Sequence, residues 1–275
     1  MREADLGIDP SATTDILTGF IRSELERTGL SRLVVGLSGG LDSAVSTYLA
    51  AVALGPERIH AVLMPYRSSS RESLTDAALV VDALGIGSET VNITAMVEGC
   101  RESVGEMDRL RLGNVMARCR MTVLYDLSAR EKALVLGTSN KTEILLGYGT
   151  LHGDMASALN PIGDLYKTQV RQLARHLQVP DLVVSKPPSA DLWPDQSDED
   201  ELGFTYEEVD NLLALLVDAR VSPATAVEKG FSREMVDRVL NLITGSQFKR
   251  RLPVIAKVST RSVGWDFRYP RDWKS

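Results

Sequence analysis

Cysteine and histidine are scarce in this chain of 275 residues. It has two cysteines, Cys100 and Cys119, and three histidines, His60, His152 and His176. The cysteines form no Cys-x-x-Cys pair and the histidines are scattered, so neither a thiolate metal centre nor a His-based one has support. We expect both cysteines to be ordinary free thiols, and neither lies in a recognisable nucleophile setting.

Long apolar runs and excess positive charge are also missing. No run approaches the ~20 apolar residues of a membrane span, and the first 15 residues lack the features of a signal peptide. We therefore expect a cytoplasmic protein with no membrane partner. The 31 Lys and Arg residues against 37 Asp and Glu give a net charge of −6. An acidic chain is a poor general binder of nucleic acid, because phosphate contacts need a basic face.

What the sequence does contain is an alternation of short apolar runs with amphipathic segments. We expect strands at 32–37, 58–65, 88–93 and 133–137, and helices at 11–28, 43–54, 71–84, 108–130, 140–147 and 166–178. This order predicts an α/β fold, a doubly wound, Rossmann-like parallel sheet flanked by helices. In such sheets the ligand lies beyond the carboxyl ends of the strands, near the topological switch point.

The composition changes after residue 185. We interpret 1–275 as a single domain, with a candidate lid loop at 185–205 that is rich in Pro, Ser and acidic residues. A C-terminal helical and aromatic tail follows at 206–275, with helices expected at 206–218, 223–230 and 233–244. Its aromatic end, Trp265 to Trp273, should dock on the chain's own core or on a partner subunit.

A glycine-rich loop follows the first expected strand and opens a helix. The loop comprises Gly36, Leu37, Ser38, Gly39, Gly40, Leu41, Asp42 and Ser43. Its glycines allow a tight turn, its serines add hydroxyl donors, and the helix N-terminus adds partial positive charge, so the loop should bind phosphate. It is not a Walker A loop, because Asp42 stands where a lysine would be expected. A carboxylate beside phosphates implies a bridging Mg²⁺.

This loop resembles the SGGxDS signature of the N-type ATP pyrophosphatases, whose fold is of the adenine nucleotide alpha hydrolase type. That superfamily cleaves ATP between the α and β phosphates to form an adenylate. Three further stretches, at 114–125, 137–154 and 161–206, are similar in order and content to segments of NAD synthetases. The resemblance covers roughly residues 30–255.

The resemblance implies that the nicotinate carboxylate of deamido-NAD is adenylated by ATP and then attacked by ammonia, which gives NAD, AMP and diphosphate. It implies that the 36–43 loop, Thr138, Lys167 and Ser189 bind ATP. Asp42 and Glu143 would bind Mg²⁺, and Asp42, Lys167 and Asp154 would be catalytic. The same resemblance implies that Arg118 and Lys249 bind deamido-NAD between the subunits of a homodimer.

Three positions depart from the family pattern: Leu151, Ala158 and Phe248. The family residues at all three serve the deamido-NAD side, so amidation of a different carboxylate stays an alternative. A tRNA-modifying enzyme of the same superfamily and a non-catalytic nucleotide sensor are further alternatives. The chain opens almost directly into the synthetase region, so we expect free ammonia as the nucleophile, unless a separate glutaminase docks. The run 249–251 is interpreted equally well as a dinucleotide-phosphate contact or as a solvated basic face.

Overall fold

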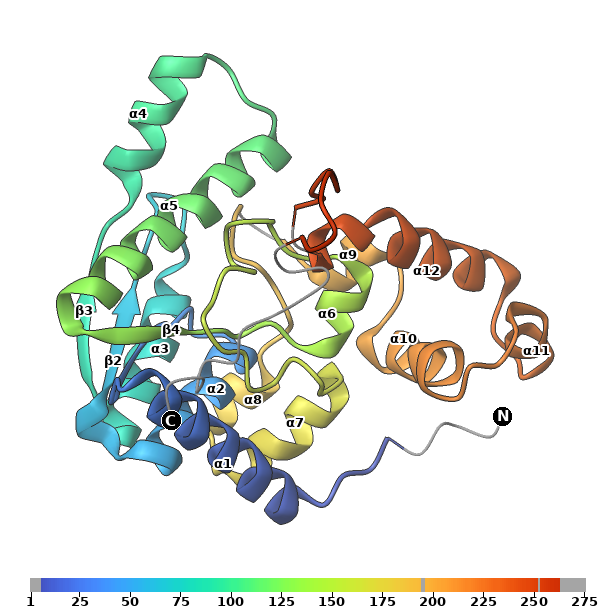
Figure 1. The fold of residues 1–275 in the computed structure, drawn as a ribbon, viewed down its shortest axis with the longest axis horizontal. Helices are drawn as coiled ribbons and strands as arrows, with labels where there is room; N and C mark the ends of the chain where they lie inside the picture. Colours follow the sequence, from blue (N-terminus) through green and yellow to red (C-terminus); the bar gives the residue numbers. More distant parts are fainter. Residues whose placement is uncertain (1–5, 194–195, 252, 263–275) are drawn as a thin grey trace.

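The computed structural model describes residues 6–193, 196–251 and 253–262. Its centre is a sheet of four parallel strands in the order β3-β2-β1-β4 (Figure 1). The strands are β1 (Arg32–Gly36), β2 (Ile59–Leu63), β3 (Gly87–Thr90) and β4 (Ala133–Leu136). Val34 of β1 pairs with His60 on one side and Val135 on the other. The expected Rossmann-like parallel sheet is therefore confirmed.

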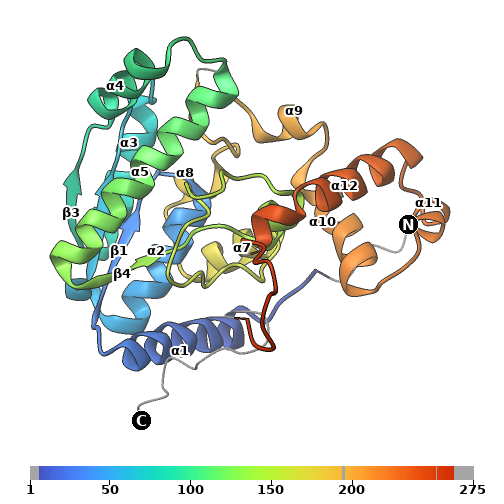
Figure 2. The same cartoon turned by 45° about the horizontal axis from the view of Figure 1, so that its top comes forward.

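Helices cover both faces of this sheet because successive residues of β1 point in opposite directions. Leu33 and Val35 pack in one core and Val34 in another. The first core holds side chains of α1 (Pro10–Thr28), α2 (Leu41–Leu54), α3 (Arg71–Leu84), α7 (Lys167–His176) and α8 (Asp181–Ser185). The second holds those of α4 (Thr94–Val104) and α5 (Arg109–Glu131). Helix α5 crosses the opposite face of the sheet, and α4 packs against α5 (Figure 2).

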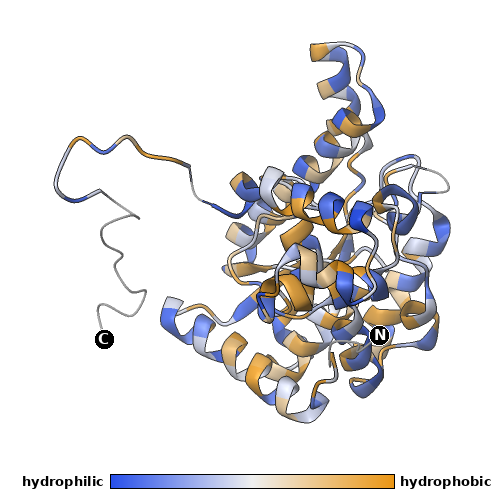
Figure 3. Cartoon of the chain, turned by 90° about the vertical axis from the view of Figure 1, so that its right-hand side faces the viewer, coloured by the Kyte–Doolittle hydropathy of each residue, from blue (hydrophilic) through white to orange (hydrophobic). Residues whose placement is uncertain are grey.

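A group of helices with its own core lies beside the sheet. It contains α6 (Lys141–Leu146), α9 (Asp198–Leu202), α10 (Tyr206–Leu213), a π-helical turn (Ala214–Asp218), α11 (Pro223–Glu228) and α12 (Arg233–Gly245). Tyr206, Leu212 and Val236 are fully buried in this core. Hydrophilic and hydrophobic residues are mixed along the helices in Figure 3, as amphipathic packing requires. Figure 1 shows α10, α11 and α12 extending away from the sheet.

Most expected elements are present, with four differences in the helices. Helix α2 begins at Leu41 rather than Ser43, because Gly40 takes an extended conformation and serves as the N-cap. Helices α4 and α8 were not expected. The 185–205 segment is not wholly an exposed loop, since it contains α9. Short 3₁₀ turns occur at Pro56–Arg58 and Gln247–Arg250. The aromatic residues Trp265, Phe267, Tyr269 and Trp273 lie outside the described residues.

The order of the strands decides where a ligand can lie. Strand β1 is bordered by β2 on one side and β4 on the other, so the chain reverses its direction of progress across the sheet there. The loops that follow β1 and β4 consequently lie next to each other at the carboxyl edge. Among the described residues, no helix is both long enough and apolar enough to cross a membrane.

Candidate functional site

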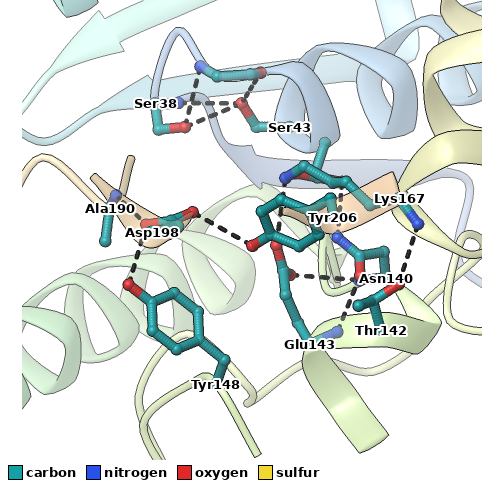
Figure 4. Close-up of polar contacts among 12 residues, drawn as sticks. Ser38, Ser43, Asn140, Thr142, Glu143, Tyr148, Lys167, Ala190, Asp198 and Tyr206 are labelled. Atoms are coloured by element: carbon teal, nitrogen blue, oxygen red, sulfur yellow. Dashed lines mark hydrogen bonds and ion pairs between the residues drawn. The ribbon is translucent and has the colours of Figure 1, made fainter. Parts of the chain in front are cut away.

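The loop between β1 and α2 is closed by its own serines. Ser38 N donates to Ser43 Oγ over 3.2 Å, and the two hydroxyl oxygens lie 3.1 Å apart (Figure 4). Ser43 Oγ also donates to the carbonyl of Gly40 over 3.0 Å. The side chains of Leu37 and Leu41 are buried in the core, so these two positions offer the site only backbone atoms. The loop is thus a compact turn of amides and hydroxyls at the start of a 14-residue helix.

Gly39 is required by the packing of this loop against α3. Its φ of +79° is unfavourable for residues with a side chain. A Cβ atom there would lie 2.2 Å from the carbonyl oxygen of Ser73 and 3.1 Å from Cβ of Asp76. The loop therefore touches the first turns of α3 directly.

The ammonium group of Lys167 lies between two carboxylates. Its Nζ donates to Asp42 Oδ2 and, over 3.2 Å, to Glu143 Oε1 (Figure 4). Asp42 comes from the first turn of α2, Glu143 from α6 after β4, and Lys167 from the first residue of α7. Lys167 is only 5% exposed. The structure therefore brings together three residues that are far apart in sequence and were all expected at the site.

Asn140 joins the two loops at the switch point. Its Nδ2 donates to Asp42 Oδ1 over 3.0 Å, and its Oδ1 accepts from the backbone N of Glu143 over 2.9 Å. Glu143 in turn accepts from the backbone N of Asn140, which completes a capping box at the start of α6. Asn140 is fully buried. It was not expected as a site residue, although its place before a helix with Glu three residues later is a capping-box signal.

Burial governs the electrostatics of this cluster. Desolvation raises the pKa of Glu143 to about 8, with the neighbouring Asp42 adding to the rise and Lys167 opposing it. Burial alone would lower the pKa of Lys167, but the charges of Asp42 and Glu143 outweigh it and leave that pKa raised. Lys167 therefore stays a cation, while the metal-free site holds Glu143 partly protonated near neutral pH.

The carboxylate oxygens of this cluster show whether it could bind a divalent cation. Asp42 and Glu143 already share one cation, the Lys167 ammonium, so their oxygens converge on one position. Proteins commonly bind Mg²⁺ through one or two carboxylates, and substrate phosphates supply further ligands. In the described part of the chain, no group of three or more His, Cys, Asp or Glu residues is placed to hold a metal. The residues present therefore fit a metal that arrives with a nucleotide.

A second row of polar residues holds the site from behind. Thr142 Oγ1 donates to Asp210 Oδ1 over 2.5 Å and accepts from the backbone N of Lys167 over 3.0 Å. Asp210 Oδ2 accepts from the backbone N of Thr168 over 2.8 Å. Both Thr142 and Asp210 are fully buried. They fix the start of α7 and therefore the position of Lys167, a role that spacing in the sequence could not reveal.

The 186–193 segment contacts α3 beside the loop. Lys186 Nζ donates to Asp76 Oδ2 over 2.6 Å and to Ser73 Oγ over 3.2 Å. Asp191 Oδ2 accepts from the backbone N of Ser70 over 3.2 Å. Ser189 lies exposed on this segment, and its Oγ accepts from the backbone N of Asp191 over 3.1 Å. Thr138 lies half-buried in the loop after β4, two residues before Asn140.

Arg118 and Lys249, which were expected to bind deamido-NAD, and Asp154, which was expected to be catalytic, lie at the 147–154 loop. Arg118 donates from Nη2 to the carbonyl of Leu151 over 3.3 Å, and Lys249 Nζ donates to the carbonyls of Gly147 and Gly149 over 2.7 and 2.8 Å. Asp154 Oδ1 accepts from the backbone N of Thr150 over 2.8 Å. Desolvation raises the pKa of the Asp154 carboxyl, although the residue as a whole is exposed to solvent.

The basic run 249–251 is not simply a solvated face, because Lys249 and Arg250 are held by backbone carbonyls. Burial lowers the pKa of Lys249, and its ammonium is bound to two carbonyls. Arg250 donates from Nη1 to the carbonyls of Ile144 and Leu145 over 2.9 and 2.8 Å, and from Nη2 to that of Ile243. Arg250 therefore caps the C-terminal turns of α6 and α12. Arg251 is exposed.

A fold of this topology, with charged groups gathered at its switch point, is that of a nucleotide-binding α/β enzyme. The sequence model described as NAD synthase matches residues 13–253. An NH(3)-dependent NAD(+) synthetase of Chlorobium phaeobacteroides is 55% identical over 100% of this chain and 99% of its own length. The chain therefore belongs to the NAD synthase family and is a ligase.

Two solved structures are similar at equal sequence identity. One is an NMN synthetase from Francisella tularensis, with a TM-score of 0.82 and 31% identity over 91% of this chain and 99% of that one. The other is an NH3-dependent NAD synthetase from Campylobacter jejuni, in complex with nitrate, with a TM-score of 0.78. It is also 31% identical and covers 91% of this chain and 100% of that one.

Proposed function

We propose that this chain uses ATP and ammonia to amidate the nicotinate carboxylate of deamido-NAD through an acyl-adenylate, giving NAD, AMP and diphosphate. The observation that carries the proposal is the convergence of Lys167, Asp42 and Glu143 beside the 36–43 loop. The name of the Chlorobium relative, at 55% identity over the whole chain, supports deamido-NAD as the acceptor and ammonia as the nitrogen source.

The chemistry requires activation because a carboxylate is a poor acyl donor. In the proposed reaction, a carboxylate oxygen attacks the α-phosphorus of ATP and diphosphate leaves. Ammonia then attacks the acyl carbon and AMP leaves, so one difficult step becomes two easier ones. The amides and hydroxyls of Ser38 and Ser43 would hold the departing diphosphate, and Lys167 would offset the charge that develops on it.

Asp42 and Glu143 are the residues that would hold Mg²⁺, with phosphate oxygens of ATP as further ligands. Bound there, Mg²⁺ would neutralise charge on the transferring phosphates. Thr138 and Ser189 are proposed ATP contacts. Thr138 lies on the loop that carries Asn140, and Ser189 on the segment that docks beside Gly39.

Arg118, Asp154 and Lys249 are assigned to the acceptor. The contacts that support this are those to the 147–154 loop, which all three residues share. Asp154 is proposed as a catalytic group there, because a carboxyl of raised pKa is suited to accept a proton from ammonia as it adds. We further propose a cytoplasmic homodimer with the acceptor site between subunits, open to a separate glutaminase.

Two observations favour a second acceptor. The Francisella structure, named an NMN synthetase, superposes with a TM-score of 0.82, and Leu151, Ala158 and Phe248 depart from the family pattern on the acceptor side. Nicotinate mononucleotide presents the same carboxylate without the adenylate half. A preference for it would leave the ATP chemistry unchanged.

Product analysis separates these functions. The purified protein is incubated with ATP, Mg²⁺ and ammonium, together with deamido-NAD or nicotinate mononucleotide. We expect NAD and AMP in equal amounts with deamido-NAD, and a much lower kcat/KM with the mononucleotide. A higher kcat/KM with the mononucleotide would establish the second acceptor. Release of ADP and orthophosphate, or no reaction with either acceptor, would contradict the proposed function.

A further inference from the structure

Lys167 contacts an aromatic ring in addition to its two carboxylates. Its Nζ lies 5.0 Å from the centroid of the Tyr206 ring, within the range of a cation–π interaction. Tyr206 is 1% exposed and begins α10. The ring therefore forms part of the wall around the buried ammonium.

A carboxylate holds this ring in place. Tyr206 Oη donates to Asp198 Oδ2 over 3.3 Å, and Asp198 is only 4% exposed (Figure 4). The other oxygen of Asp198, Oδ1, accepts from the backbone N of Ala190 over 3.1 Å and from the Tyr148 hydroxyl over 2.9 Å. Asp198 therefore ties the 186–193 segment to the ring that faces Lys167.

We infer that Tyr206, oriented by Asp198, is a positioning residue that holds the Lys167 ammonium in place when a nucleotide enters the site. This inference rests on the proposed function, in which Asp42 and Glu143 take up a cation with ATP. Those two carboxylates are then shared with that cation, so the ring supplies a larger part of the stabilisation of the ammonium than before. A weaker cation–π interaction between the ring and the ammonium must consequently weaken nucleotide binding.

The chain contains a matched arrangement next to the site, built on residues adjacent in sequence to Asn140 and Lys167. Lys141 Nζ lies 4.6 Å from the centroid of the Tyr166 ring, and Tyr166 Oη donates to Asp218 Oδ2 over 2.8 Å. Lys141 is paired with Asp218 over 2.9 Å, and neither residue contacts Asp42 or Glu143 in the contacts described above. The same three residue types thus recur with a lysine whose ion-pair partner is Asp218 rather than Asp42 or Glu143, which provides an internal control.

The test varies the electron density of the ring without changing its shape. Phenylalanine and its mono-, di- and trifluorinated forms are placed at position 206 of the full chain, and the Kd of MgATP is measured by calorimetry. Tyr206→Phe should keep the Kd within about threefold of the natural protein. We expect the affinity to fall stepwise with each fluorine, by about 3- to 10-fold in total, since a cation–π contact is worth about 2- to 30-fold in binding.

The same series at position 166 should leave the Kd of MgATP unchanged. Tyr206→Leu, which removes the ring, should weaken binding by about 10-fold. A flat response to fluorination at 206, or equal responses at 206 and 166, would overturn the inference. The readout needs no acceptor: a protein that binds MgATP but makes no NAD would contradict the proposed function alone.

Discussion

Asn140 Nδ2 donates to Asp42 Oδ1 over 3.0 Å across 98 positions of sequence. This one bond joins the loop after β1 to the loop after β4, the two loops that meet at the switch point. The same side chain caps α6 through its oxygen. Asn140 therefore connects the backbone of Glu143 to the carboxylate of Asp42. Glu143 and Asp42 are the two acidic residues that contact the Lys167 ammonium.

Asn140→Asp should separate the two roles of this residue. An aspartate keeps the oxygen that caps α6 but replaces the donor with a second acceptor that faces Asp42. We expect MgATP affinity to fall while the helix stays capped. Asn140→Ala loses the cap as well, at about 1–2 kcal/mol, which lowers Tm by about 2–8 °C. Calorimetric binding and thermal unfolding measure the two effects, and equal Tm losses in both variants would contradict the separation.

Asp42→Asn should abolish AMP formation, with a loss of at least about 100-fold, while the fold is retained. The substitution removes one of the two charges that attract a cation and the ion-pair partner of Lys167. Asp218→Asn is the matched control, because that carboxylate pairs with Lys141 and not with Lys167. AMP release and near-native Tm values are the measurements. Full turnover by the Asp42 variant would show that the metal assignment is wrong.

The pKa of about 8 for Glu143 predicts that the affinity for MgATP depends on pH. A raised carboxyl pKa means that the metal-free site holds a proton below pH 8, and Mg²⁺ binding must displace it. The affinity for MgATP should therefore rise with pH up to about 8 and then level off. The folding stability of the metal-free protein should change in the opposite direction. Protonated Glu143 contributes stability at low pH, and this contribution is lost as pH rises toward 8.

Calorimetry in buffers of different ionisation enthalpy tests this prediction at pH 7. The heat should report a fraction of a proton released for each MgATP bound. Glu143→Gln has no proton to release at this position, so its residual affinity should vary little between pH 6 and 8. An unchanged proton release in that variant would assign the titration to another group.

The alternation of strands and helices was sufficient to predict the sheet, because buried strands and amphipathic helices leave distinct apolar periods. Gly36 to Ser43 could be placed for the same reason, since a strand and a helix border the loop. Helix α4 was not predicted because only Val97 of its eleven residues is buried. In addition, its N-cap residue Ile93 makes no side-chain capping bond. Its apolar signal is correspondingly weak.

The residues behind the site could not be predicted from the sequence. Asp210 and Asp198 lie on helices with many acidic neighbours, and their pattern resembles that of solvated faces. Only the folded chain shows that Asp210 accepts hydrogen bonds from the Thr142 hydroxyl and from the first turn of α7. It also shows that Asp198 accepts a hydrogen bond from the Tyr206 hydroxyl. Their roles depend on contacts between distant elements, which no local spacing records.

Gly39→Ala should impair the nucleotide binding that we propose for the 36–43 loop, and Gly19→Ala provides its control. At Gly39 an added methyl group meets a left-handed φ of +79° and the Ser73 carbonyl at 2.2 Å. The conformation alone costs about 1–2 kcal/mol, and because the obstacle is backbone, the loop or the start of α3 must move. We expect a lower Tm and a loss of MgATP affinity of about 10-fold or more.

Gly19 lies within α1, and apart from its own stretch of helix no heavy atom lies within 4 Å of the position of its added Cβ. Gly19→Ala should therefore raise stability by about 0.5–1 kcal/mol, because alanine favours the helix, and should leave MgATP binding unchanged. Thermal unfolding and calorimetry of both variants complete the comparison. Since both substitutions add the same methyl group, a loss of binding only at Gly39 would place the effect in the loop. Equal binding by both would show that the loop does not contact the nucleotide.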